Sequence, residues 1–355
     1  MRILIVKLSA IGDLVHALPA VAAIRQNLPD AEISWVVEQR SAEIIRGCPS
    51  IDHVIEIDTR STRGGKVIEE ILPEMTRQAR AVRERRYDLA IDMQGLIKSA
   101  VIAKISRAKR RWGFSRSGLR EPASRLLLSD VVKIPGRTHV IHKNMHLAAT
   151  ALGFEFDSKD IKFPISTNDE HVAEAAAIIE RVGPRFAILN PGGGWVTKLW
   201  HAEKFGLLAD RIFAETGMAT VVATGPNETD LARVIAETSR TAKMILTQPG
   251  LKGFYELAKH SAVYIGGDTG PTHIAIAAGA PVVGLFGPTE WWRNGSLAAD
   301  DICVERTDIS CRTDCHRRTC SNWICMDSDV ESVFAAVTER LRRAAAVTSS
   351  DSVAS

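Results

Sequence analysis

Arg2-Ile3-Leu4-Ile5-Val6-Lys7 is a short apolar run with one charge at each end, and Leu8-Ser9-Ala10-Ile11-Gly12-Asp13 follows it directly. The run has the length of a buried strand rather than of a signal peptide's apolar centre, because Gly12 and Asp13 stand where further apolar residues would be needed. Gly12 permits a tight turn, and a helix is expected from about residue 14 to 27. A strand, a tight turn and a helix in this order indicate a doubly wound α/β domain.

The same alternation recurs along the chain. Further strands are expected at 33–37, 54–57, 89–93, 111–114, 186–190, 220–224, 244–247, 262–266 and 282–286. Helices are expected at about 41–47, 66–86, 96–106, 140–152, 169–182, 202–216, 227–238, 253–260 and 271–278. Short β-branched runs separated by helices are typical of parallel sheets covered on both faces.

The pattern predicts two successive Rossmann-like domains. Residues 154–184 are the expected join and contain the turn-rich stretch 163–168, which gives one domain over residues 1–165 and a second over 166–328. An amphipathic helix is expected at 329–346, and the polar residues 347–355 are expected to be a disordered tail. Each domain should bind its ligand at the carboxyl ends of its strands.

The composition is that of a soluble globular protein, with 45% hydrophobic and 25% charged residues. No apolar run reaches the roughly 18 residues that would span a bilayer, so a cytoplasmic protein is expected. The net charge is only +3, yet 20 Lys and Arg face 8 Asp and Glu between residues 60 and 143. This excess indicates an anionic partner, such as a phosphorylated glycolipid or a membrane surface, although solvated helix faces would also explain it. Aromatic residues are sparse among these charges and no nucleic-acid-binding module is present, which argues against nucleic acid.

Asp13 is the first candidate for chemistry. At the carboxyl end of a strand its carboxylate could accept a proton from a sugar hydroxyl, and it could equally cap the following helix. The loop has no Gly-x-Gly-x-x-Gly pattern, which removes the main support for a dinucleotide-dependent dehydrogenase.

Glycine-rich loops follow two strands of the second half. In Asn190-Pro191-Gly192-Gly193-Gly194-Trp195-Val196-Thr197-Lys198 the backbone can approach a ligand closely, and Lys198 could neutralise a phosphate. In Gly266-Gly267-Asp268-Thr269-Gly270-Pro271-Thr272-His273 the free N–H groups of a helix starting near Pro271 would suit a diphosphate. Asp268 would cap or orient this loop. Glu228, in a third loop, could bind ribose hydroxyls or serve as a helix N-terminal acid.

These loops, in this order, resemble glycosyltransferase family 9, the bacterial ADP-heptose transferases of lipopolysaccharide core synthesis. The strongest carriers are residues 7–13 with His16-Ala17-Leu18-Pro19-Ala20, and residues 267–273. Asp92-Met93-Gln94-Gly95-Leu96-Ile97-Lys98-Ser99-Ala100 and Arg120-Glu121-Pro122 look like the heptosyltransferase I branch.

The resemblance implies a GT-B fold, with two Rossmann-like domains that face each other across a cleft. It implies an inverting transfer of L-glycero-D-manno-heptose from ADP-heptose to the Kdo of Kdo-lipid A, by a peripheral enzyme at the inner face of the cytoplasmic membrane that needs no catalytic cofactor. Transfer to the first heptose, another nucleotide sugar, or a UDP-sugar epimerase of the same fold are the alternatives.

The resemblance also assigns roles to residues. Asp13 matches the catalytic base and Lys198 the lysine at the donor phosphates. The implied donor contacts are Gly193, Gly194, Thr197, Lys198, Glu228, Asp268, Thr269, Gly270 and His273. The implied acceptor contacts are Ser9, Gly12, Arg60, Arg63, Lys66, Gln94, Lys98 and Arg120. Gly193-Gly194 and a single Thr197 stand where the branch often has paired hydroxyls before the lysine.

Five of the six cysteines lie between residues 303 and 325. Cys311, Cys315, Cys320 and Cys325 could hold a structural Zn²⁺, which a reducing compartment favours over two disulfides. Their spacing lacks the paired Cys-x2-Cys of a zinc ribbon, so thiols without metal are the alternative.

Overall fold

The computed structural model describes residues 1–59, 68–241, 243–312, 315 and 317–353. The chain divides into two compact units, Met1–Ser166 and Thr167–Ser355. In the ranges described, no helix combines the length and the apolar character that crossing a bilayer requires.

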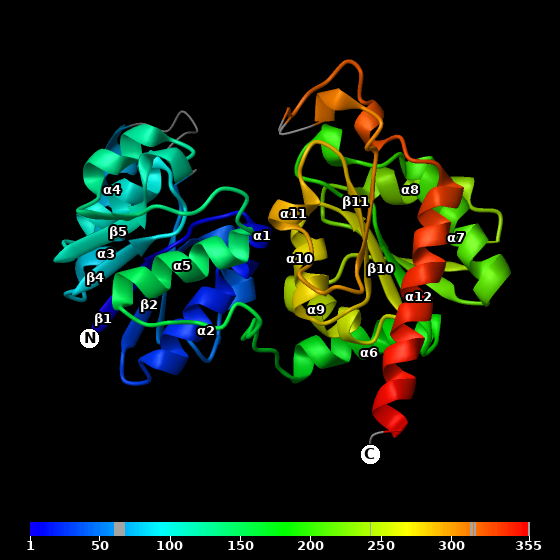
Figure 1. Ribbon diagram of the computed structural model, residues 1–355, viewed down its shortest axis with the longest axis horizontal. Helices are drawn as coiled ribbons and strands as arrows, with labels where there is room; N and C mark the ends of the chain where they lie inside the picture. Colours follow the sequence, from blue (N-terminus) through cyan, green and yellow to red (C-terminus); the bar gives the residue numbers. More distant parts are fainter. Residues whose placement is uncertain (60–67, 242, 313–314, 316, 354–355) are drawn as a thin grey trace. The chain divides into compact units, whose positions relative to one another are not determined.

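The first unit is built on a parallel sheet whose six described strands lie in the order β3-β2-β1-β4-β5-β6 (Figure 1). The strands are β1 (Arg2–Val6), β2 (Glu32–Glu38), β3 (His53–Ile57), β4 (Leu89–Asp92), β5 (Arg110–Phe114) and β6 (Asp130–Val132). The α-helices are α1 (Ile11–Val15), α2 (Leu18–Asn27), α3 (Ile68–Arg83), α4 (Ile97–Ile105) and α5 (Val140–Leu152). Short 3₁₀ helices are η1 (Gln39–Ile45), η3 (Arg116–Gly118) and η4 (Pro122–Leu127).

The second unit repeats this plan, with the described strands in the order β12-β11-β10-β7-β8-β9. They are β7 (Phe186–Asn190), β8 (Ala219–Ala223), β9 (Met244–Thr247), β10 (Val263–Gly267), β11 (Val282–Phe286) and β12 (Ile302–Glu305). Its α-helices are α6 (Asp169–Val182), α7 (Ala202–Thr216), α8 (Thr229–Thr238), α9 (Leu251–Lys259), α10 (Gly270–Ala277), α11 (Trp291–Asn294) and α12 (Val330–Val353). The 3₁₀ helices are η5 (Val196–Lys198), η6 (Ser310–Arg312) and η7 (Ile324–Met326).

Both sheets have the Rossmann strand order, in which the chain reverses its direction of progress once. The reversal lies between the adjacent strands β1 and β4 in the first unit and between β7 and β10 in the second. At such a switch point the loops after the two strands diverge and leave a crevice for a ligand. The two doubly wound domains that the sequence predicts are therefore confirmed. The expected ligand sites are the loops that follow β1, β4, β7 and β10.

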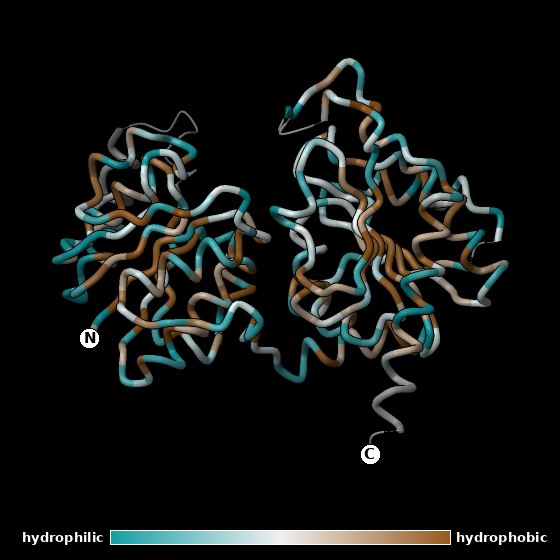
Figure 2. Tube along the Cα trace, in the orientation of Figure 1, coloured by the Kyte–Doolittle hydropathy of each residue, from teal (hydrophilic) through white to brown (hydrophobic). Residues whose placement is uncertain are grey.

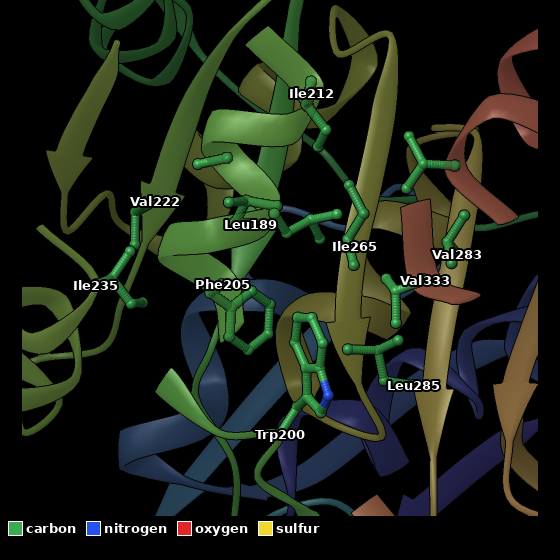
Figure 3. Close-up of a cluster of buried hydrophobic side chains, with 14 of the residues drawn as sticks. Leu189, Trp200, Phe205, Ile212, Val222, Ile235, Ile265, Val283, Leu285 and Val333 are labelled. Carbon is green, nitrogen blue, oxygen red and sulfur yellow. The ribbon is translucent and has the colours of Figure 1, made fainter. Parts of the chain in front are cut away.

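Apolar residues concentrate in the sheets, which are brown in the centre of each unit in Figure 2. In the second unit, side chains of β7, β10 and β11 meet those of α7 and α12, with Leu189, Ile265 and Val283 beside Phe205 and Val333 (Figure 3). All five side chains are almost completely buried. Burying one such side chain stabilises the fold by roughly 1.5–3 kcal/mol, so this core holds the strand ends in place.

Several elements differ from the sequence expectation. The helix expected at 14–27 begins at Ile11 and is broken after Val15, because Pro19 fits only in a first helical turn and α2 starts afresh at Leu18. Residues 41–47 were expected in a helix, and the structure has the 3₁₀ helix η1 there. Strands β6 and β12 were not expected, and α12 continues to Val353 instead of ending at 346.

Candidate functional site

The loop after β1 carries a half-exposed carboxylate beside a buried ammonium group. Asp13 lies in the first turn of α1, and its side chain is 42% exposed. One carboxylate oxygen, Oδ2, accepts a hydrogen bond from the Ala10 backbone N–H at 3.2 Å. The other, Oδ1, lies 3.6 Å from the Nζ of Lys7, whose side chain is only 5% exposed. Asp13 thus caps the turn with one oxygen while its carboxylate stays accessible to a ligand.

The loop after β4 supports the loop after β1. The side-chain oxygen of Gln94 accepts hydrogen bonds from the backbone N–H groups of Leu8 at 2.9 Å and Ser9 at 3.3 Å. Lys7 donates to the backbone carbonyl of Met93 at 3.0 Å. Ser9 lies in the loop after β1, and Gly12 is buried at the start of α1, which follows that loop. The switch point of the first sheet is therefore tied together by side chains that reach across it.

Asp92, the last residue of β4, stabilises the loop that follows this strand. Its carboxylate accepts hydrogen bonds from the backbone N–H groups of Gln94 and Gly95 and from the Ser99 hydroxyl, at 2.9, 3.1 and 2.9 Å. Burial raises the pKa of Asp92 to about 6, because it disfavours the charge more than these hydrogen bonds and the nearby Lys7 favour it.

The basic residues expected to face the acceptor are only partly described. Lys98 donates to Glu38 at 2.9 Å and to the Thr59 hydroxyl at 3.0 Å. Burial acts to raise the pKa of Glu38, but the hydrogen bonds from Thr59 and Lys98 outweigh it and hold the pKa below its ordinary value. Arg120 lies exposed between η3 and η4. The expected contacts Arg60, Arg63 and Lys66 lie outside the described residues.

In the second unit, the loops after β7 and β10 meet in a buried charge cluster. The Nζ of Lys198 donates to the Asp268 carboxylate at 2.6 Å and to the Asp268 backbone carbonyl at 3.1 Å. The Nε2 of His273 lies 3.1 Å from the other carboxylate oxygen. Burial acts to raise the pKa of Asp268, but His273 and Lys198 together hold it far below its ordinary value. Asp268 thus orients the lysine and the histidine, and the N-cap of α10 is Thr269.

A second buried network sets the position of helix α10. The Thr269 hydroxyl donates to the side-chain oxygen of Asn190 at 3.2 Å, and Asn190 donates to the Ala223 carbonyl at 2.7 Å. The hydroxyl of Thr272 hydrogen-bonds to the hydroxyl of Tyr264 at 2.8 Å. These bonds link the ends of β7, β8 and β10 to the first turn of α10, whose N–H groups have no partner within the helix. The free N–H groups and the positive end of the helix dipole suit an anion beside Lys198.

Glu228 bridges two backbone loops. Its carboxylate accepts hydrogen bonds from the N–H groups of Gly193 at 3.2 Å and Gly225 at 2.7 Å. A Cβ at Gly192 would collide with that carboxylate, whereas one at Gly194 would meet nothing within 4 Å. Glu228 precedes α8 without capping it through its side chain. It therefore lies at the edge of the glycine-rich loop, where a ribose was expected.

Thr197, in the glycine-rich loop after β7, contacts the segment that follows β12. Its side chain is buried, and its hydroxyl donates to the backbone carbonyl of Arg317 at 2.5 Å. The ring of Trp195 lies beside the side chains of Lys198 and Arg318. Its centroid is 4.3 Å from the Lys198 Nζ and 5.2 Å from the Arg318 guanidinium carbon. The lysine thus stands at the ligand side, while the threonine fastens the loop to the segment after β12.

Sequence reasoning missed the supporting residues. The sequence marks Lys7 only as the end of a strand and Asp92 only as part of a family motif, and Asn190, Tyr264 and Glu38 carry no signal of their own. The partners of Lys7, Asn190 and Glu38 include Met93, Ala223 and Lys98, which lie far away along the chain, so no local sequence pattern indicates these contacts. An acid or amide as the last residue of a buried strand, as at Asp92 and Asn190, is the one signal that was available.

The chain is similar to known proteins over most of its length. Residues 75–324 match the family model of Glycosyltransferase family 9 (heptosyltransferase). Lipopolysaccharide heptosyltransferase 1 of Pseudomonas aeruginosa is 29% identical over 324 residues, which cover 90% of this chain and 88% of the relative. The protein of the same name from Escherichia coli strain K12 is 28% identical over 295 residues, covering 82% and 89%.

A solved structure shares the fold. The Escherichia coli heptosyltransferase WaaC with ADP has a TM-score of 0.78 at 24% identity, with coverage of 96% of this chain and 100% of that chain. This likeness confirms the expected GT-B class, and the relatives named above confirm the resemblance to the heptosyltransferase I branch. Because the family model matches well over half of the sequence, the chain belongs to glycosyltransferase family 9 and is a glycosyltransferase.

Proposed function

We propose that the protein transfers L-glycero-D-manno-heptose from ADP-heptose to the Kdo residue of Kdo-lipid A, with inversion at the anomeric carbon. One observation carries the proposal: each Rossmann-like sheet presents the chemistry that one half of this reaction needs at its switch point. The first presents the accessible carboxylate of Asp13, and the second presents Lys198 at the N-terminus of α10. The heptosyltransferase 1 relatives support heptose as the sugar, and the structural neighbour solved with ADP supports ADP as the nucleotide.

Asp13 acts as the general base. The acceptor hydroxyl gives its proton to the Asp13 carboxylate as its oxygen forms a bond to the anomeric carbon. The Lys7 ammonium group holds the Oδ1 atom of that carboxylate, and the hydrogen bond from the Ala10 N–H holds Oδ2. The carboxylate is therefore positioned before the acceptor arrives, which lowers the entropic cost of the proton transfer.

Lys198 and α10 stabilise the leaving group. The bond between the anomeric carbon and the β-phosphate oxygen breaks, and its electron pair leaves with ADP. Attack from the opposite face turns a β-linked donor into an α-linked product. Of the three hydrogens on the Lys198 ammonium, Asp268 takes two in the described structure, which leaves one for a phosphate oxygen. The N–H groups around Thr269 and Gly270 add a positive dipole end where negative charge develops.

The basic character of residues 60–143 fits an acceptor that carries phosphates and sits in a membrane. We place the enzyme in the cytoplasm, at the inner face of the cytoplasmic membrane, where lipid A phosphates and anionic lipids would attract this surface. The attraction should weaken with salt, because exposed charges are screened within about 10 Å at 0.1 M ionic strength.

The substrate assignment is tested by measuring ADP release from ADP-heptose with two acceptors, Kdo-lipid A and the same lipid already carrying one heptose. We expect turnover with the first and at least about a hundredfold less with the second. The reverse preference would assign the enzyme to the second heptose. A thermal-shift comparison of ADP, UDP and GDP checks the donor independently, since only the cognate nucleotide should stabilise the fold strongly.

Asp13→Asn tests the role of the base. The amide keeps the size of the side chain but cannot accept the proton, so turnover should fall by at least about a hundredfold. The affinity for ADP, which belongs to the other unit, should change by less than about twofold. Turnover near that of the unmodified protein would remove Asp13 from the mechanism.

A further inference from the structure

The segment between β12 and α12 gathers four cysteines around one pocket. Cys311, Cys315, Cys320 and Cys325 all line a cavity of about 460 Å³, together with Thr197 and residues near Trp323. Figure 1 shows this segment in orange, as a loop at one end of the second unit. The only regular structure in its described residues is two single turns of 3₁₀ helix, η6 and η7.

The four thiols are close enough to act on one another. Cys315 and Cys325 are partly buried, Cys311 and Cys320 are exposed, and all four line the same cavity. The repulsion between their ionised forms would be relieved by a cation in their midst, because a metal ion stabilises each thiolate that it binds. Arg317 lines the same cavity and adds positive charge at its rim. None of the six cysteines, all of which are described, is paired in a disulfide.

The two sides of the loop are anchored differently. On one side, Met326 is buried in the core of the second unit, and Cys325 and Trp323 pack against that core. On the other side, the Arg317 carbonyl accepts the hydrogen bond from Thr197. Between these anchors the loop contributes no residue to the buried core except next to Met326, among the residues described. A short segment with so little apolar burial needs another source of stability, for which a structural metal is a common solution.

We propose that Cys311, Cys315, Cys320 and Cys325 bind one Zn²⁺ ion as thiolates, and that the ion fixes the loop against the stretch that carries Thr197 and Lys198. Four thiolates in a tetrahedron at about 2.3 Å form a closed structural zinc site. Each thiol that binds releases its proton to solvent. In the described residues no three His, Cys, Asp or Glu side chains are already gathered at metal-binding distance. The thiols therefore move inward as the ion binds, so metal binding and the change in their positions are one step.

Metal binding at the cysteines would also affect the loop that carries Lys198. Thr197 is hydrogen-bonded to the cysteine segment, Lys198 follows it directly, and Arg318 of the segment lies against the ring of Trp195. Zinc binding to the segment should therefore restrain residues 192–200.

Metal content is the first measurement. The full-length protein is purified with a reducing agent and without chelators, and its zinc and iron are counted by mass spectrometry. We expect about one zinc per chain in the unmodified protein and in Cys303→Ser, whose cysteine lies on β12 outside the group. The double variant Cys315→Ser/Cys320→Ser should retain less than about a tenth of that. Unchanged zinc in the double variant, stoichiometric iron, or two disulfides found by alkylation without reduction would overturn the proposal.

A second measurement uses the unmodified chain, so that misfolding of a variant cannot mimic the result. Co²⁺ added to reduced, metal-free protein should give the absorption of a tetrahedral thiolate complex, and one equivalent of Zn²⁺ should abolish it. Amide hydrogen exchange in residues 192–200 should be slower with zinc than without. A cobalt complex without sulfur-to-metal absorption would refute the thiolate site, and identical exchange rates would refute the coupling to the Lys198 loop.

Discussion

The Nζ of Lys198 lies 2.6 Å from a carboxylate oxygen of Asp268, although 70 residues separate the two in the sequence. Their side chains are only 12% and 6% exposed. A second ion pair in the same unit, Lys204 with Asp327, has the same 2.6 Å separation but exposures of 24% and 49%. The two pairs thus differ mainly in burial, and burial decides how much the loss of one partner costs.

Replacing Lys198 by methionine should be far more damaging than the same change at Lys204. Lys198→Met keeps the aliphatic stem beside Trp195 but leaves the Asp268 carboxylate buried without its ammonium partner. We expect a loss of about 3 kcal/mol in the free energy of unfolding at pH 7. Lys204→Met should cost less than about 1 kcal/mol. Urea denaturation of both variants measures the difference, and equal losses would contradict the role assigned to burial.

The same variant should show a definite pH dependence. In the unmodified protein the pKa of Asp268 is lowered, so the stability from its ionised form is fully present above its ordinary pKa and is lost only as the pH falls through the lowered value. Without Lys198 the carboxyl should protonate at a higher pH, which relieves the buried charge. The deficit of Lys198→Met should therefore shrink between pH 7 and pH 4. A deficit that grows toward pH 4 would mean that the lysine does not act through Asp268.

Asp92 should contribute in the opposite direction. Its folded pKa of about 6 lies above its ordinary value of 3.8, so the folded state binds the proton more tightly than the unfolded chain. Stability from this group is fully present below the ordinary pKa and is lost as the pH rises through about 6. Asp92→Asn cannot ionise, yet its oxygen can still accept from Gln94 and Gly95. Relative to this variant, the unmodified protein should lose roughly 2 kcal/mol between pH 4 and pH 7. A difference that does not vary with pH would contradict the raised pKa.

The positions of the candidate loops could be predicted from sequence, because each follows a short apolar strand and is accompanied by a glycine near the start of the next helix or turn. Asp13, Lys198 and Asp268 were therefore found in the right loops. The break between α1 and α2 was signalled by Pro19 but went unused. The edge strands β6 and β12 were missed because they are short and only partly buried, so they lack the apolar runs that mark central strands.

The pairings across each switch point could not be predicted. The contacts of Lys7 with Met93, of Gln94 with the β1 loop, and of Glu228 with Gly193 depend on which strands lie side by side. Strand order is set by packing over the whole sheet, and no local pattern encodes it. The sequence therefore names residues that can do chemistry, while the fold decides which of them are held together.

Catalysis should not depend on a divalent cation. In the proposed mechanism Lys198 and the N–H groups of α10 stabilise the departing diphosphate, which is the task that Mg²⁺ performs in many other nucleotide-dependent enzymes. Initial rates with and without millimolar Mg²⁺ should therefore agree within about twofold. A fall of about tenfold or more on omitting magnesium would show that the ion, and not the lysine, bears most of that charge.

Two neighbouring glycines offer a test of the Glu228 bridge. A Cβ at Gly192 would collide with the Glu228 carboxylate and push it away from the N–H groups of Gly193 and Gly225, whereas a Cβ at Gly194 enters open space. Gly192→Ala should therefore cost about 1–3 kcal/mol of unfolding free energy, and Gly194→Ala should stay within about 0.5 kcal/mol.

A double-mutant cycle identifies the cause of that cost. If Gly192→Ala acts by displacing the carboxylate, removing the carboxylate with Glu228→Ala should add little to it, because the two hydrogen bonds are already lost. The two losses should then be non-additive by about 1 kcal/mol or more. Additive losses would mean that Gly192 is needed for its own backbone conformation, and that the carboxylate bridge contributes separately. Urea denaturation of the two single variants and the double variant distinguishes these outcomes without any substrate.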